Sequence, residues 1–148
     1  MARKIIFTGG HAATTAISVI DEIEEKGLDW DLHWVGTKRA IEGSKVLSFE
    51  AKELPQRGVK FHSIVAGRVQ RRFTFWTIPS LLKIPVGFMQ AFFLLLFMKP
   101  DMVFSFGGFA AVPVVVAAWL LGKPVYLHEQ TAAPGLANKV SSRFAKKI

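Results

Sequence analysis

The chain of 148 residues contains no cysteine. Neither a disulfide framework nor a thiolate metal site is therefore available, which fits a reducing compartment. The chain also has no Gly-Lys-Ser or Gly-Lys-Thr sequence and no complete Gly-X-Gly-X-X-Gly pattern, so a P-loop of the nucleotide-hydrolysing kind is disfavoured. Its four histidines lack the spacing of metal ligands, and we expect neither a metal nor a cofactor.

Acidic residues are missing between Leu54 and Pro100, and the whole chain has a formal net charge of +8. Such a balance predicts an anionic partner: nucleic acid, an acidic membrane surface or a phosphorylated substrate. Within this stretch, cations are interleaved with aromatic residues, a pattern that favours an anionic membrane surface over a solvated basic loop followed by a core helix. A nucleic-acid partner is not expected, because it leaves the long apolar helix unexplained. The residues expected to form this membrane patch are Arg68, Arg71, Arg72, Phe73, Phe75, Trp76, Lys83, Phe88 and Phe92.

Two uncharged runs are long enough to resemble membrane spans. Residues 102–121 are interrupted by Gly107-Gly108 and by Pro113, so we expect a strand, a loop and a buried helix there. Residues 84–98 are short for a span and are bracketed by lysines, yet they are the stronger membrane candidate. The apolar stretch near the N-terminus is too short for a signal peptide, so secretion is not expected.

Apolar runs of strand type alternate with helix-type periodicity along the whole chain. This alternation predicts one α/β domain over residues 1–148, with a Rossmann-like doubly wound parallel sheet. The expected strands are 3–8, 31–35, 60–65, 102–106 and 124–128, and the expected helices are 12–26, 44–53, 79–98, 110–121 and a last one from about 134 to the end.

Three of the strand-to-helix junctions carry residues suited to binding. Because the carboxyl ends of parallel strands meet at one edge, we expect the three to converge on a phosphate-bearing, polyhydroxylated ligand. At each one a structural role remains open, namely a tight turn, close helix–strand packing or a polar network. His33 and His62 lie in or beside strands and are expected to be structural. The junctions are Thr8-Gly9-Gly10-His11, Gly107-Gly108 and His128-Glu129-Gln130.

Six segments stand out along the chain: Thr8-Gly9-Gly10-His11, Trp34-Val35-Gly36-Thr37, residues 99–103, Gly107-Gly108-Phe109, residues 127–130 and residues 134–139. Together they resemble the N-terminal domain of the MurG glycosyltransferase family, in that family's order and spacing. The resemblance implies one half of a GT-B glycosyltransferase on the cytoplasmic face of the cell membrane. In that family N-acetylglucosamine passes from UDP-N-acetylglucosamine to lipid I, an undecaprenyl-diphosphate acceptor, in peptidoglycan synthesis.

The resemblance also implies roles for individual residues. Thr8, Gly9, Gly10, Gly107 and Gly108 would hold the acceptor diphosphate. His11 would remove the proton from the acceptor hydroxyl. The lining of the cleft would come from His128, Glu129, Gln130 and Asn138, and the membrane patch would extend from Arg68 to Phe97.

The family's second domain, which binds the donor nucleotide, has no counterpart in these 148 residues. Three explanations are open: part of a longer enzyme, one subunit of a split transferase for this or another polyprenyl-diphosphate-linked sugar, or a non-catalytic membrane-peripheral binding domain. Under the first two, the chain requires a donor-binding GT-B domain as partner and is inactive alone.

Overall fold

A computed structural model describes the chain except for residues 1, 11, 40–45, 67–76 and 131–134, and describes only the backbone of residues 77–82. Strands and helices alternate as the sequence predicts. The elements are β1 (Arg3–Thr8), α1 (Ala13–Glu25), β2 (Trp30–Gly36), α2 (Phe49–Glu53), the 3-10 helix η1 (Leu54–Arg57), β3 (Lys60–Ser63), α3 (Thr77–Met98), β4 (Met102–Ser105), α4 (Ala111–Leu120), β5 (Val125–Leu127) and α5 (Leu136–Ser142).

The five strands form one sheet in the order β3-β2-β1-β4-β5, and every pairing is parallel. The prediction of a Rossmann-like doubly wound sheet is confirmed. The chain builds outward from β1 to β3 and then returns to the other side of β1 with β4. The order therefore reverses between β1 and β4, which is the position where open α/β sheets bind ligands.

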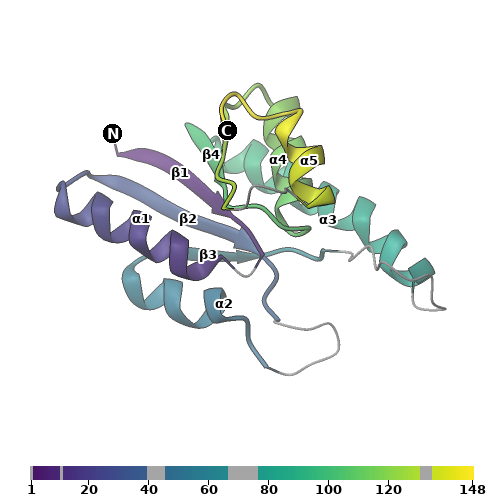
Figure 1. Cartoon of the computed structure of the whole chain (residues 1–148), viewed down its shortest axis with the longest axis horizontal. Helices are drawn as coiled ribbons and strands as arrows, with labels where there is room; N and C mark the ends of the chain where they lie inside the picture. The colour runs from purple at the N-terminus through teal and green to yellow at the C-terminus, as the bar shows by residue number, and fades with distance from the viewer. Residues whose placement is uncertain (1, 11, 40–45, 67–76, 131–134) are drawn as a thin grey trace.

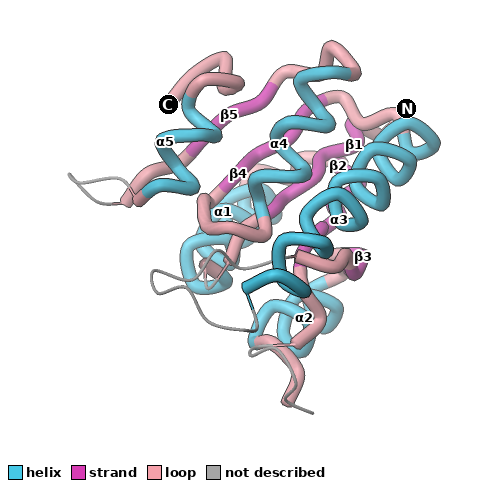
Figure 2. The backbone as a smooth tube through the Cα atoms, turned by 90° about the vertical axis from the view of Figure 1, so that its right-hand side faces the viewer, coloured by secondary structure: helices cyan, strands magenta, loops and turns pink. Residues whose placement is uncertain are grey.

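Helices cover both faces of the sheet (Figures 1 and 2). Alternate residues of β1 point to opposite faces, so Ile5 and Phe7 belong to the core beneath α1, while Ile6 belongs to the core beneath α3 and α4. Residues 102–121 are β4 followed by α4, which confirms the expected strand, loop and buried helix. The buried residues of α4 are all small or β-branched: Ala111, Val114, Val115, Ala117 and Ala118.

The long helix α3 is apolar on more than one side. Ala91 and Leu95 are fully buried, whereas Phe97 is 79% exposed. Gly87 brings the helix against the chain after β3, because a Cβ atom at this position would lie 1.9 Å from the carbonyl oxygen of Val65. Within the described residues, no helix has the combination of length and hydropathy needed to cross a bilayer.

Two predicted helices differ from the observed ones. The helix expected over 44–53 begins at Phe49. Ser48 is its N-cap residue, and the Ser48 hydroxyl accepts a hydrogen bond from the Ala51 amide at 3.2 Å. The last helix was expected to reach the C-terminus but ends at Ser142. The segment after it pairs with the outer edge of β5 instead: the Lys146 amide donates to Val125 at 2.7 Å, and the Leu127 amide donates to Lys147 at 3.0 Å.

Candidate functional site

The two glycine turns meet at the point where the strand order reverses. The Gly10 amide donates a hydrogen bond to the Gly107 carbonyl oxygen at 2.9 Å. Gly108 has φ +89°, and a Cβ atom there would lie 3.1 Å from the Gly10 nitrogen. Only glycine combines this left-handed backbone with so close an approach. The turns after β1 and β4 are therefore in direct contact and form one continuous backbone surface.

A polar network holds the second turn in place. Oδ1 of Asn138 accepts a hydrogen bond from the Gly108 amide at 3.0 Å, and its Nδ2 donates to the Glu129 carboxylate. Gly107 has φ +83°, and a Cβ atom there would lie 2.4 Å from the Asn138 amide oxygen. Two residues expected to line the cleft thus also fasten the glycine turn to α5 and to the end of β5.

The junction after β5, His128-Glu129-Gln130, contacts both the start of α1 and the end of β4. Nε2 of Gln130 donates to the hydroxyl of Thr15 in the first turn of α1. The His128 amide donates to the Ser105 carbonyl at 2.8 Å, and its ring lies 6.3 Å from that of Phe106. The three junctions are therefore close together in space, as the sequence suggests, although their roles in binding stay predictions.

Several backbone amides of the glycine turns are already used within the protein. Besides those of Gly10 and Gly108, the Gly107 amide donates to the Ser105 hydroxyl at 3.2 Å. Within the described part of the chain, the amides of Phe109 and Ala110 have no acceptor. They precede α4, where the helix dipole favours negative charge. The amides best placed for an anion therefore lie just after the second glycine pair.

Sequence reasoning did not anticipate Glu50. Its carboxylate is 6% exposed and accepts a hydrogen bond from the Ala12 amide at 3.1 Å, at the start of α1. A negative charge thus already occupies the N-terminus of α1, which makes α4 the better anion site. In the sequence, Glu50 lies among charged residues of a short helix 38 positions away, so no local signal connects it with this site.

The remaining predicted residues are placed as follows. Thr8 ends β1 and is fully buried, and its hydroxyl has no partner among the described residues. Phe88 and Phe92 of α3 are half-buried and pack against the core, and Lys83 lies half-buried on the same helix. We call the exposed large apolar side chains described on α3 the α3 surface; they are Ile84, Val86, Met89, Phe93, Leu96 and Phe97. Outside the described residues lie His11, Arg68, Arg71, Arg72, Phe73, Phe75 and Trp76.

A second polar cluster lies on β2 and β3. Nδ1 of His33 is 2.9 Å from Nε2 of His62, and Asp31 contacts both His33 at 3.0 Å and Lys60 at 2.8 Å. The hydrogen bond from Lys60, and then that from His33, lower the pKa of Asp31 to about 2. Burial, and then the charges of His33 and Lys60, lower the pKa of His62, with Asp31 acting in the opposite sense. Among the described residues, no group of three His, Asp or Glu side chains is arranged to hold a metal ion.

Comparison with known proteins gives relatives that match nearly the whole of this chain. A chain from Streptococcus pyogenes serotype M49 (strain NZ131) is 38% identical over 148 residues, which are 98% of this chain and 39% of that protein. One from Bacillus cereus (strain ATCC 10987 / NRS 248) is 37% identical over 149 residues, 99% of this chain and 40% of that protein. Both are named UDP-N-acetylglucosamine–N-acetylmuramyl-(pentapeptide) pyrophosphoryl-undecaprenol N-acetylglucosamine transferase, the second with the number 2.

The solved structures agree with this. The crystal structure of Acinetobacter baumannii MurG matches with a TM-score of 0.75 and 25% identity, over 97% of this chain and 40% of that one. The chain thus spans about 40% of the length of the relatives that it matches. The model of the glycosyltransferase family 28 N-terminal domain matches residues 5–148. Because this model covers nearly the whole chain, the chain belongs to glycosyltransferase family 28 and matches that family's N-terminal domain.

Proposed function

We propose that the chain is the acceptor-binding part of a membrane-associated glycosyltransferase. The enzyme transfers N-acetylglucosamine from UDP-N-acetylglucosamine to a lipid-linked diphosphate acceptor in peptidoglycan synthesis. The names of the relatives support the reaction, and one observation on this chain carries the proposal: the glycine turns after β1 and β4 are joined at the switch point of the sheet.

In this proposal the acceptor diphosphate lies against the joined glycine turns. The amides of Phe109 and Ala110, which have no acceptor among the described residues, donate to it, and the α4 dipole stabilises its charge. Asn138 and Glu129 act by fixing the backbone from which these amides project. The exposed side chains of His128 and Gln130 are placed to meet the sugar hydroxyls.

His11 follows the first glycine pair in the sequence, and we assign to it the removal of the proton from the attacking hydroxyl. General-base catalysis of this kind is worth about 10²–10⁴-fold in rate. The hydroxyl oxygen attacks the anomeric carbon of the donor sugar, and UDP leaves with the electrons of the broken bond. A donor-binding GT-B domain, on the same or a separate polypeptide, supplies the nucleotide sugar.

The α3 surface is the part that we assign to the membrane. Phe93 and Phe97 are 46% and 79% exposed and stack at 6.5 Å, so a large aromatic area faces outward. In a chain of net charge +8, such an area favours peripheral binding to anionic lipid. We assign the chain to the cytoplasmic face of the cell membrane, as the resemblance to its family implies.

The acceptor role is tested with a soluble lipid-linked sugar diphosphate titrated into the 148-residue chain. Gly108→Ala should weaken binding at least about tenfold, because its Cβ atom would push the two glycine turns apart. Gly122→Ala is the matched control: Gly122 also has positive φ, at +67°, but a Cβ atom there meets nothing within 4 Å. Equal affinities for the two folded variants, or no saturable binding by the unchanged chain, would refute the acceptor role.

The membrane role has its own test, cosedimentation with anionic vesicles. Phe97→Ser should reduce the bound fraction, whereas Leu120→Ser, also at an exposed position, should not. Parallel titration with single-stranded RNA separates the alternative of nucleic-acid binding, which predicts a steep loss of affinity with salt. Turnover should appear only when the donor-binding domain is added.

A further inference from the structure

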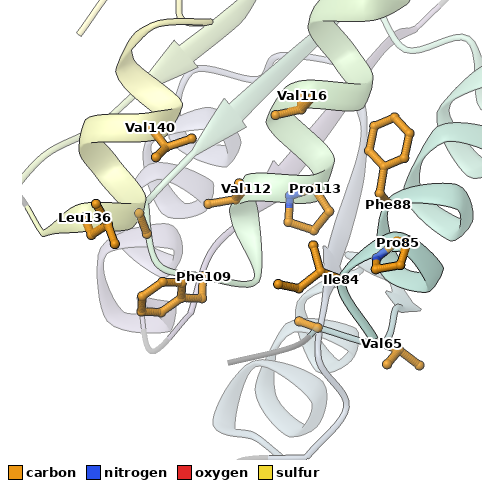
Figure 3. A pocket seen from close by; sticks show the side chains of 12 residues that line it. Val65, Ile84, Pro85, Phe88, Phe109, Val112, Pro113, Val116, Leu136 and Val140 are labelled. Atoms are coloured by element: carbon orange, nitrogen blue, oxygen red, sulfur yellow. The ribbon is translucent and has the colours of Figure 1, made fainter. Parts of the chain in front are cut away.

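An apolar pocket of about 450 Å³ lies between α3, α4 and α5 (Figure 3). The 12 described residues that line it are all apolar, and they come from elements far apart in the sequence. Ile84 and Phe88 come from α3, Val112 and Val116 from α4, and Val140 from α5. Such a lining suits hydrocarbon, because its described residues offer no side-chain polar group with which to hold water or a sugar.

The pocket shares its wall with the diphosphate site. Phe109, which lines it, directly follows Gly108, and among the described residues its own amide has no acceptor at the start of α4. Ala137, also in the lining, directly precedes Asn138, which holds the glycine turn. At both positions, a residue that lines the apolar pocket is bonded directly to a residue of the proposed diphosphate site: Phe109 to Gly108, and Ala137 to Asn138.

The other end of the pocket leads to the α3 surface. Pro85 lines the pocket and also borders a shallow groove formed with Val86, Met89, Gln90 and Phe93, of which only Gln90 is polar. A largely apolar path therefore leads from the glycine turns, between the helices, to the aromatic side chains that we assign to the membrane. A narrow, flexible chain that carries a diphosphate at one end and enters a bilayer at the other matches this path.

We propose that the pocket binds the part of the acceptor's isoprenoid chain that lies nearest the diphosphate. The inference rests on the proposed function, which places the diphosphate at the glycine turns. It adds that the chain recognises the lipid carrier by direct contact, so that affinity depends on the hydrocarbon as well as on the sugar. The rest of the hydrocarbon continues along the α3 surface into the membrane.

The test uses four soluble probes of increasing length, titrated into the 148-residue chain: inorganic diphosphate and the isopentenyl, geranyl and farnesyl diphosphates. Each buried methylene strengthens binding several-fold, so affinity should rise at least about tenfold from the five-carbon to the ten-carbon probe. The increase should become smaller once the pocket is filled.

Two matched variants locate the hydrocarbon. Leu136→Asp puts a charge on the pocket wall at a position that is 63% exposed and in the first turn of α5, where an acidic residue is compatible with the helix. Leu120→Asp puts the same charge at a position that is 54% exposed and outside the pocket. The measured quantity is the ratio of farnesyl to isopentenyl affinity, in which a general effect of the new charge on the diphosphate cancels. This ratio should collapse in Leu136→Asp and stay high in Leu120→Asp.

The outcomes separate the two proposals. If all diphosphates bind with equal affinity, or if both variants keep the same ratio, the hydrocarbon does not enter the pocket, while the acceptor role stands. If neither these probes nor the lipid-linked sugar diphosphate binds, both proposals are wrong. A length dependence that only Leu136→Asp abolishes supports both.

Discussion

Replacing Asn138 by Asp changes one atom of the network that holds the second glycine turn. The new carboxylate can still accept the hydrogen bond from Gly108, but the donor to Glu129 becomes a second negatively charged oxygen. The lost hydrogen bond to a charged group is worth about 1.5–3 kcal/mol, and repulsion between the two carboxylates adds to it. Protonating one of them limits the total penalty, since holding a carboxylic acid protonated at pH 7 costs about 4 kcal/mol.

We therefore expect Asn138→Asp to lower the free energy of unfolding by about 2–4 kcal/mol at pH 7. The sign of the pH dependence follows from proton uptake. The folded variant binds a proton more readily than the unfolded chain, so it regains stability as the pH falls toward 4. Asn138→Ala removes both hydrogen bonds without adding charge, and its loss should not change with pH over that range.

The assay is urea denaturation of the unchanged chain and the two variants at pH 7, 6 and 5, with the slope of the transition used to confirm a common folded state. An Asp variant that is as stable as the unchanged chain at pH 7, or that loses further stability on acidification relative to the Ala variant, would show that Asn138 does not bridge the glycine turn and Glu129.

Three further predictions concern packing, titration and the anion site. Gly87→Ala should destabilise the fold by about 1–3 kcal/mol in urea denaturation, because its Cβ atom would meet the Val65 carbonyl, even though alanine is the better helix former. The control is Gly135→Ala, where a Cβ atom meets nothing within 4 Å; it should change stability by less than about 0.5 kcal/mol. Because the pKa of His62 is lowered in the folded chain, the free energy of unfolding should decrease as the pH falls below about 6.5. His62→Gln should make this decrease smaller in unfolding curves recorded from pH 8 to 5. The same dependence of stability on pH in the variant and the unchanged chain would contradict the prediction. Glu50→Gln keeps a hydrogen-bond acceptor for the Ala12 amide but removes the negative charge of the Glu50 side chain. Calorimetry should therefore show that inorganic diphosphate binds several-fold more tightly to the variant. Weaker binding would mean that the anion does not bind near the glycine turns.

The sequence is sufficient to predict the elements whose signals are local. The run from Arg3 to Thr8 is a strand with the expected bounds, and the alternation of strands and helices gives the parallel sheet. The glycines and polar residues that follow the strands also come together, because parallel strands present their carboxyl ends at one edge.

Features that depend on distant contacts could not be predicted. Glu50 at the start of α1, the pairing of His33 with His62, and the pocket between three helices all arise from tertiary packing, for which the sequence has no periodic signal. The end of α5 was placed too late for the same reason, since backbone pairing with β5 ends the helical run. Within α3, composition predicted exposed aromatics, but only the packing decides that Phe97 faces outward and Phe88 inward.

The pairing of the C-terminal segment with β5 affects how the chain behaves at high concentration. A three-residue border strand with open amides and carbonyls is a template on which a neighbouring molecule can extend the sheet. Here the molecule's own Lys146 and Lys147 occupy that position and add two positive charges beside it. Removing the pairing of Lys146 and Lys147 while keeping Ala145, which packs against the core, should therefore leave the core intact yet allow self-association. This pairing thus acts as a barrier to intermolecular sheet growth.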